Sequence, residues 1–137
     1  MTDRSRIGFT SEPTRHAVDA WRVKLFRQAI GEPASASHVP PTFLKALESE
    51  HLSGTALMRL LDVPLRGVLH AEQSFEIDTP VQVGDTVEIS RTITDIHDKR
   101  GGAMTFIVVD SHFRVDDRPV ATARQTIVVR NTPEAAP

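Results

Sequence analysis

The sequence contains no cysteine, which excludes disulfide bonds, a thiolate nucleophile and any metal site with cysteine ligands. It also lacks long apolar runs. The longest is the four residues of segment 106–109, whereas a membrane-spanning helix needs about 20. The first residues are polar and charged, with no apolar segment behind them, so we expect no secretory signal and a cytoplasmic protein.

A marked charge of either sign is missing as well. Sixteen Lys and Arg face 18 Asp and Glu, giving a net charge of −2, and the two signs alternate along the chain. We therefore expect neither a nucleic-acid nor a membrane partner. With 137 residues the chain is long enough for one domain. We place this domain at residues 1–130 and a flexible, Pro- and Ala-rich tail at 131–137.

Helical patterns dominate the first half of the chain. Apolar residues recur at three- and four-residue spacings and predict a helix over 15–30, ended by Gly31, with one buried face made of Val18, Trp21, Leu25, Phe26 and Ala29. Prolines make 31–41 a loop. A second helical region begins at Pro41 and continues to Leu61, with an interruption near Ser53-Gly54.

The second half alternates with a period of two, which is typical of strands. We expect strands over 68–78, 87–94, 103–115 and 120–130, joined by turns at 83–85, 101–102 and 116–119. Arg91 is expected to break the inward row of its strand, and Ile96 changes the parity, which indicates a bulge or a strand end. Segment 103–115 is apolar on both faces, which is expected in the centre of a sheet or at an oligomer interface. Helices followed by strands predict an α+β fold.

Three segments together resemble one known family. They are Leu69-His70-Ala71-Glu72-Gln73-Ser74-Phe75, Pro80-Val81-Gln82-Val83-Gly84-Asp85, and Met104-Thr105-Phe106 with Val120-Ala121-Thr122-Ala123-Arg124-Gln125-Thr126. The chain from Ile7 to Arg130 resembles the MaoC-like dehydratase family, especially its N-terminal-type module, the FAS1-like dehydratase domain. The resemblance implies a hot-dog fold, in which an antiparallel sheet wraps around a central helix.

The resemblance also implies an activity. Family members are (R)-specific enoyl-thioester hydratases, or in reverse 3-hydroxyacyl-thioester dehydratases, which act on CoA- or carrier-protein-bound chains without a cofactor. Their first helix ends in Phe, followed six residues later by the Asp of a Gly-Asp-x-Asn-Pro-x-His segment. Here Phe26 is followed by Glu32 and then His38. Glu replaces Asp, and the acid-to-histidine spacing is one residue longer. On this basis Glu32 and His38 are the expected catalytic residues.

Further residues are expected to bind substrate. Pro41, Thr42 and Phe43 open the central helix, where unpaired backbone N–H groups could stabilise the oxygen of an enolate. His70 lies on a predicted strand in the most family-like segment, where it faces the substrate or, as we favour, bonds to a neighbouring backbone group. The simpler interpretation of the catalytic pair also stays open: Glu32 merely ends a helix, and His38 is a solvated loop residue.

The remaining cations and imidazoles are expected at the surface. No metal site is expected, because the other histidines, His16, His51, His97 and His112, lack acidic partners at metal-ligand spacing. Five arginines could include contacts to a CoA phosphate or an acidic carrier protein, but most of them are expected to be solvated residues of the sheet edge: Arg91, Arg100, Arg114, Arg118 and Arg124.

Hot-dog modules usually pair so that their sheets run together and acyl tunnels form at the shared boundary. We therefore expect a homodimer, or a heterodimer with another hot-dog subunit, that binds an acyl-CoA or acyl-carrier-protein thioester. Two alternatives to a self-sufficient hydratase stay open. One is a non-catalytic subunit that shapes the acyl tunnel while a sister chain supplies the acid and histidine. The other is an acyl-CoA thioesterase, in which a carboxylate activates water against the carbonyl.

Overall fold

The computed structural model describes residues 2–33, 38–50 and 54–131. Within them, five strands form one antiparallel sheet in the order β1–β3–β4–β5–β2. The strands are β1 (Thr14–Ala17), β2 (Val68–Ile77), β3 (Thr86–Lys99), β4 (Met104–Val115) and β5 (Arg118–Arg130). The helices are α1 (Ala20–Ala29), α2 (Phe43–Glu48) and α3 (Gly54–Leu60), with single 3-10 turns at Arg4–Arg6 and Arg100–Gly102.

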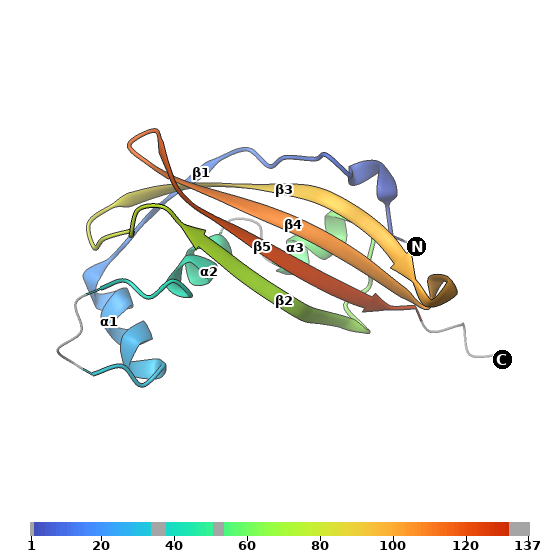
Figure 1. Cartoon of the computed structure of the whole chain (residues 1–137), viewed down its shortest axis with the longest axis horizontal. Helices are drawn as coiled ribbons and strands as arrows, with labels where there is room; N and C mark the ends of the chain where they lie inside the picture. The colour runs from blue at the N-terminus through green and yellow to red at the C-terminus, as the bar shows by residue number, and fades with distance from the viewer. Residues whose placement is uncertain (1, 34–37, 51–53, 132–137) are drawn as a thin grey trace.

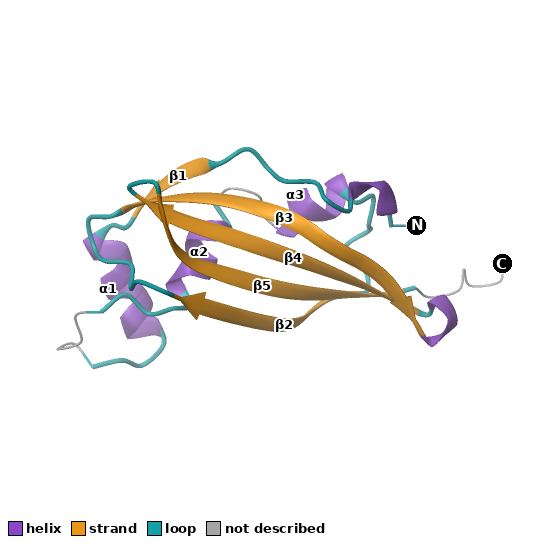
Figure 2. Cartoon of the chain, turned by 45° about the horizontal axis from the view of Figure 1, so that its top comes forward, coloured by secondary structure: helices purple, strands orange, loops and turns teal. Residues whose placement is uncertain are grey.

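The sheet curves around α2 and α3, which lie against one face of it, while α1 lies at one end (Figures 1 and 2). Alternating side chains of the long strands point inward and bury their apolar surface against these helices. One core cluster gathers around Phe43, Leu44 and Phe113 near α1 and α2, and a second packs under α3. This confirms the expected α+β architecture.

Several details of the expected sheet are confirmed. β4 is the central strand, as its two apolar faces predicted. The register of β3 against β4 shifts between Ile93 and Asp95, which is the bulge indicated by the change of parity at Ile96. The second helical region is divided into α2 and α3. Of the expected interruption near Ser53-Gly54, Gly54 begins α3 and Ser53 lies outside the described residues.

The expected helix over 15–30 is wrong in two respects. Residues 14–17 form β1, which pairs with the edge of β3, and the helix begins only at Ala20. The buried face is also different, because Val23 is buried whereas Trp21 and Leu25 point to solvent. Val18 explains the error: it is buried through backbone bonds to Asp85 and Gly84 at the end of β1, and it does not continue a helical stripe.

Asn131, the first residue of the expected tail, is held by its side chain, which donates to the Gly102 carbonyl oxygen and to Thr105 Oγ1. The rest of that tail, 132–137, lies outside the described residues, so the division of the chain stays a prediction. In the described part of the chain, every helix is too short or too polar to cross a bilayer.

Gly67 allows a close crossing of two segments. Its φ is +83°, and an added Cβ would lie 3.0 Å from the Arg130 carbonyl oxygen. We expect Gly67→Ala to lower the free energy of unfolding by about 1–3 kcal/mol, measured by urea denaturation. Gly84→Ala is the matched control, because Gly84 has φ +94° but no atom within 4 Å of the added Cβ. An equal loss in both variants would show that the contact with Arg130 adds nothing.

Candidate active site

The two expected catalytic residues lie next to each other. Helix α1 ends at Ala29, and Gly31, with φ +80°, turns the chain so that Glu32 N–H donates to the Arg27 carbonyl oxygen. Further along the chain, His38 Nε2 lies 3.1 Å from Glu32 Oε1. The Glu32 side chain is 24% exposed and that of His38 is 59% exposed. A carboxylate and an imidazole at this distance can share or relay a proton.

Local contacts hold this pair in place and leave one acceptor available. Arg27 Nη1 donates to the His38 carbonyl oxygen at 2.8 Å, which ties the returning loop to α1. Glu32 Oε2 is buried and has no hydrogen-bond partner among the described residues. A hollow of about 100 Å³ lies beside it, lined by Lys24, Arg27, Gln28, Glu32 and Pro33. This space is large enough for about three water molecules beside the Glu32 side chain.

The expected substrate-binding residues at the start of α2 follow His38 by three to five positions. Pro41 and Thr42 are exposed, whereas Phe43 is buried, with its ring 5.5 Å from that of Phe26 in an edge-to-face contact. The Phe43 N–H donates to the Pro40 carbonyl oxygen at 2.9 Å. It is therefore not the unpaired donor that we expected, because this N–H already bonds to the carbonyl oxygen of Pro40, three residues earlier.

His70 is not brought to this pair. It lies opposite Ile127 in the sheet, next to the core cluster under α3, whereas the Glu32 loop follows α1 at the other end of the molecule. Its Nε2 lies 3.1 Å from the Glu72 carbonyl oxygen, and its Nδ1 lies 3.5 Å from Gln125 Nε2. These contacts match the structural role that we favoured, and a role in substrate binding remains a proposal.

A buried polar layer crosses the core between the two apolar clusters, and the sequence interpretation missed it. Arg91 Nη2 lies 2.8 Å from Glu48 Oε1, and the two side chains are 2% and 1% exposed. Three further side chains complete the layer: Lys45 and Gln125 bond to this pair, and Ser111 accepts from Arg91 Nε. Burial lowers the pKa of the Arg91 guanidinium, and the charge of Glu48 opposes that effect.

Arg91 was therefore wrongly expected to break the inward row and to lie in solvent. Its position in β3 keeps the alternation of Val87, Ile89 and Ile93, so the parity alone places it inside. Glu48 follows Leu44 by four residues and shares its buried helix face. Two opposite charges at two core positions were the signal that could have predicted this ion pair.

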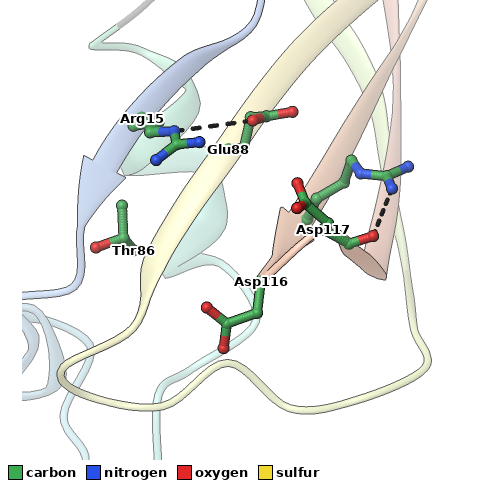
Figure 3. A pocket seen from close by; sticks show the side chains of 6 residues that line it. Arg15, Thr86, Glu88, Asp116 and Asp117 are labelled. Atoms are coloured by element: carbon green, nitrogen blue, oxygen red, sulfur yellow. Dashed lines mark hydrogen bonds and ion pairs between the residues drawn. The ribbon is translucent and has the colours of Figure 1, made fainter.

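Another hollow, of about 200 Å³, lies at the end of the sheet that carries the β4–β5 turn (Figure 3). Its lining is charged: Arg15 points towards Glu88, Arg114 donates to the Asp117 carbonyl oxygen, and Asp116 lies at the rim. A lining of this kind does not suit an acyl chain. Among the described residues, no three His, Asp or Glu side chains are placed to hold a metal ion.

Comparison with known proteins places this geometry in context. The family model of the FAS1-like dehydratase domain region matches residues 5–123. A UPF0336 protein of Saccharopolyspora erythraea is 28% identical, and the match covers 96% of this chain and 94% of that protein.

Solved structures agree in fold. One chain of the C-terminally truncated HadBC (3R-hydroxyacyl-ACP dehydratase) complex from Mycobacterium tuberculosis is similar, with a TM-score of 0.74 and 22% identity, over 90% of this chain and 96% of that chain. The MaoC-like dehydratase from Rhodospirillum rubrum has a TM-score of 0.66 and 17% identity, over 93% of this chain and 94% of that chain. The sheet wrapped around α2 is thus the hot-dog fold.

Proposed function

The chain belongs to the FAS1-like dehydratase domain family, and from this premise we propose that it is an (R)-specific enoyl-thioester hydratase, or in reverse a 3-hydroxyacyl-thioester dehydratase. The observation that carries the proposal is the 3.1 Å contact between Glu32 and His38, beside a hollow that can hold water. These two residues have the chemistry that the reaction requires, namely a base and a group that positions water.

In the direction of hydration, the Glu32 carboxylate positions a water molecule by accepting a hydrogen bond from it, beside the hollow that Glu32 lines. His38 removes a proton from this water while the water oxygen bonds to C3 of the enoyl thioester. The electron pair of the C2–C3 double bond moves towards the thioester carbonyl, and the imidazolium then protonates C2. Dehydration follows the same steps in reverse, so that water leaves from C3.

The start of α2 supplies the proposed contacts to the thioester. Pro41 and Thr42 are exposed and follow His38 within four residues, so they border the catalytic loop. The ring of Phe43 lies beneath them, packed against Phe26 and partly covered by the guanidinium of Arg22 at 5.8 Å. The packing of Phe43 therefore holds the catalytic loop at a fixed distance from the core.

The proposed active form contains two hot-dog modules paired along β2. In the described sheet β2 is an edge strand of ten residues, and its Leu69 and Ile77 side chains are exposed. If two β2 strands pair in antiparallel fashion, the start of one lies beside the end of the other. His70, near the start of β2, would then approach the partner's catalytic loop, which gives it a role in substrate binding across the boundary.

We expect the double variant Leu69→Lys/Ile77→Lys to weaken this pairing by about tenfold or more, because lysines on both paired strands repel one another and a charged edge strand pairs poorly. Analytical ultracentrifugation of the purified chain measures the effect. Mixing this variant with Leu69→Glu/Ile77→Glu should restore pairing through opposite charges. An unchanged mass in both single preparations would mean that the chains associate through a different surface.

The function itself is tested with crotonyl-CoA. We expect the purified chain to remove the enoyl absorbance and to form (R)-3-hydroxybutyryl-CoA. Release of free thiol from saturated acyl-CoA, with no change at the double bond, would overturn the proposal in favour of a thioesterase.

A second candidate is a non-catalytic subunit of a heteromeric dehydratase. The large exposure of His38 and the small volume of the hollow beside Glu32 favour it, because an acyl chain needs a longer enclosed channel. The HadBC complex to which the chain is similar consists of two different subunits by its name. Hydration of crotonyl-CoA that begins only after a second MaoC-like subunit is added would support this candidate.

A further inference from the structure

Helix α1 presents an apolar face that nothing in the described chain covers. Trp21 and Leu25 are 64% and 55% exposed, whereas Val23 is fully buried. Residues four apart on a helix lie within about 40° of each other, so the two large side chains form one stripe on the outside of α1. The helix lies at the end of the molecule, away from the middle of the sheet (Figure 2). Exposed Trp and Leu side by side are typical of an interaction surface.

The same helix is positively charged, although the chain as a whole has a net charge of −2. Its ten residues include three cations and no acid. Arg22 forms an ion pair with Glu50, and Arg27 is engaged by the His38 carbonyl oxygen. Lys24 is exposed and has no ion pair among the described residues, and it adjoins the stripe formed by Trp21 and Leu25.

This surface leads directly to the catalytic pair. Lys24 and Gln28, on the outer side of α1, line the same hollow as Glu32. The helix rises about 1.5 Å per residue, so Leu25 lies only about 8 Å along the axis from Ile30, where the catalytic loop begins. A partner bound to α1 would therefore hold its substrate close to Glu32 and His38.

We propose that the outer face of α1, defined by Trp21, Lys24, Leu25 and Gln28, docks an acidic amphipathic helix of an acyl-carrier protein. The inference rests on the proposed function, since the carrier delivers the thioester to the Glu32–His38 pair. Two apolar anchors beside a cation complement a helix with apolar residues and carboxylates. The nucleotide end of CoA suits this face less well, because a polyphosphate is bound by several converging cations and α1 offers one that is free.

The test uses a carrier protein loaded with a crotonyl thioester and measures its binding to the whole chain by calorimetry. We expect Trp21→Ala and Lys24→Glu each to weaken binding by about tenfold. Salt should weaken binding to the unaltered chain, and Lys24→Glu should reduce that dependence. The matched controls are Leu65→Ala and Arg66→Glu. They remove a large apolar side chain and reverse a positive charge at exposed positions at the other end of the sheet, and they should leave binding unchanged.

A kinetic readout separates this inference from the proposed function. If the chain hydrates both substrates, Trp21→Ala should lower the ratio of kcat/KM for the crotonyl-carrier to kcat/KM for crotonyl-CoA by about tenfold. Carrier binding that depends on α1, without any hydration, would uphold docking and refute self-sufficient catalysis. Hydration of crotonyl-CoA with carrier affinity unaffected by the α1 variants would overturn docking alone. A change in the mass of the assembly without a change in carrier affinity would show that α1 contacts a second copy, and would also overturn it.

Discussion

Replacing His38 by alanine is expected to lower kcat for crotonyl-CoA hydration by about 10²–10⁴-fold, with little change in KM. In the proposed reaction the imidazole carries a proton between water and carbon, which matters in the transition state more than in the bound substrate. His38 is exposed and lies in a loop, so its removal should leave the fold intact. Steady-state kinetics and circular dichroism on the same preparation check both expectations.

Glu32→Gln tests the partner of the imidazole. Glutamine keeps the size of the side chain but cannot orient the imidazole or the water as a charged acceptor. Because Glu32 and His38 are hydrogen-bonded and act as a unit, the double variant should be no worse than the more damaging single one.

His97→Ala is the matched control for the histidine variant. His97 is also a partly exposed histidine, with its Nδ1 2.7 Å from Asp95 Oδ2, but it lies on β3 away from the catalytic loop. Its activity should equal that of the unaltered chain. Equal losses in the His38 and His97 variants would trace the effect to stability and would remove His38 from the catalytic role.

Replacing Arg91 by methionine is expected to lower the free energy of unfolding by about 3–5 kcal/mol. Methionine fills much of the same space, so the loss arises from charge: Glu48 remains buried with one of its cations gone. Lys45, 2.8 Å from Glu48 and partly exposed, can compensate in part, which places the expected loss near the lower end of the range.

The double variant Glu48→Met/Arg91→Met removes both charges and should recover most of the lost stability. Urea unfolding followed by circular dichroism is the suitable measurement, because the single tryptophan, Trp21, is exposed and its fluorescence would change little. Protein concentration must be held constant, since the proposed pairing of chains would add to the apparent stability. A double variant as unstable as the single one would show that the polar layer fills space and that its charges do not matter.

The strands were predicted well from the sequence because a two-residue alternation has a direct meaning in a sheet: one parity points to the core. The change of parity at Ile96 pointed to the irregularity after Ile93, whereas segment 103–115 was predicted from the apolar side chains on both of its faces. The helix over 15–30 failed because Val18, Trp21 and Leu25 have helical spacing, although Val18 is buried by a strand and the other two are not buried. Periodicity detects an apolar stripe, but it does not say what lies opposite.

The candidate site was predicted only in part. Glu32 and His38 are six residues apart in the sequence and in contact in the structure, so the spacing of the motif was informative. Glu48 and Arg91 are separated by more than forty residues and meet only through the packing of α2 on β3, which a local pattern does not encode. The donor expected at Phe43 was lost because the proline-rich segment closes a turn of its own.

The two margins of the sheet differ, and this difference limits how far such chains can assemble. On the outer side of β3, the N-terminal segment bonds to the strand at Ile93 and Arg91. The rest of that side is paired with β1, which has only four residues. A strand that short does not template another sheet, so of the described strands β2 alone offers a long margin. Under the proposed pairing along β2, two chains would use up both long margins, so a filament would not grow by further addition of strands.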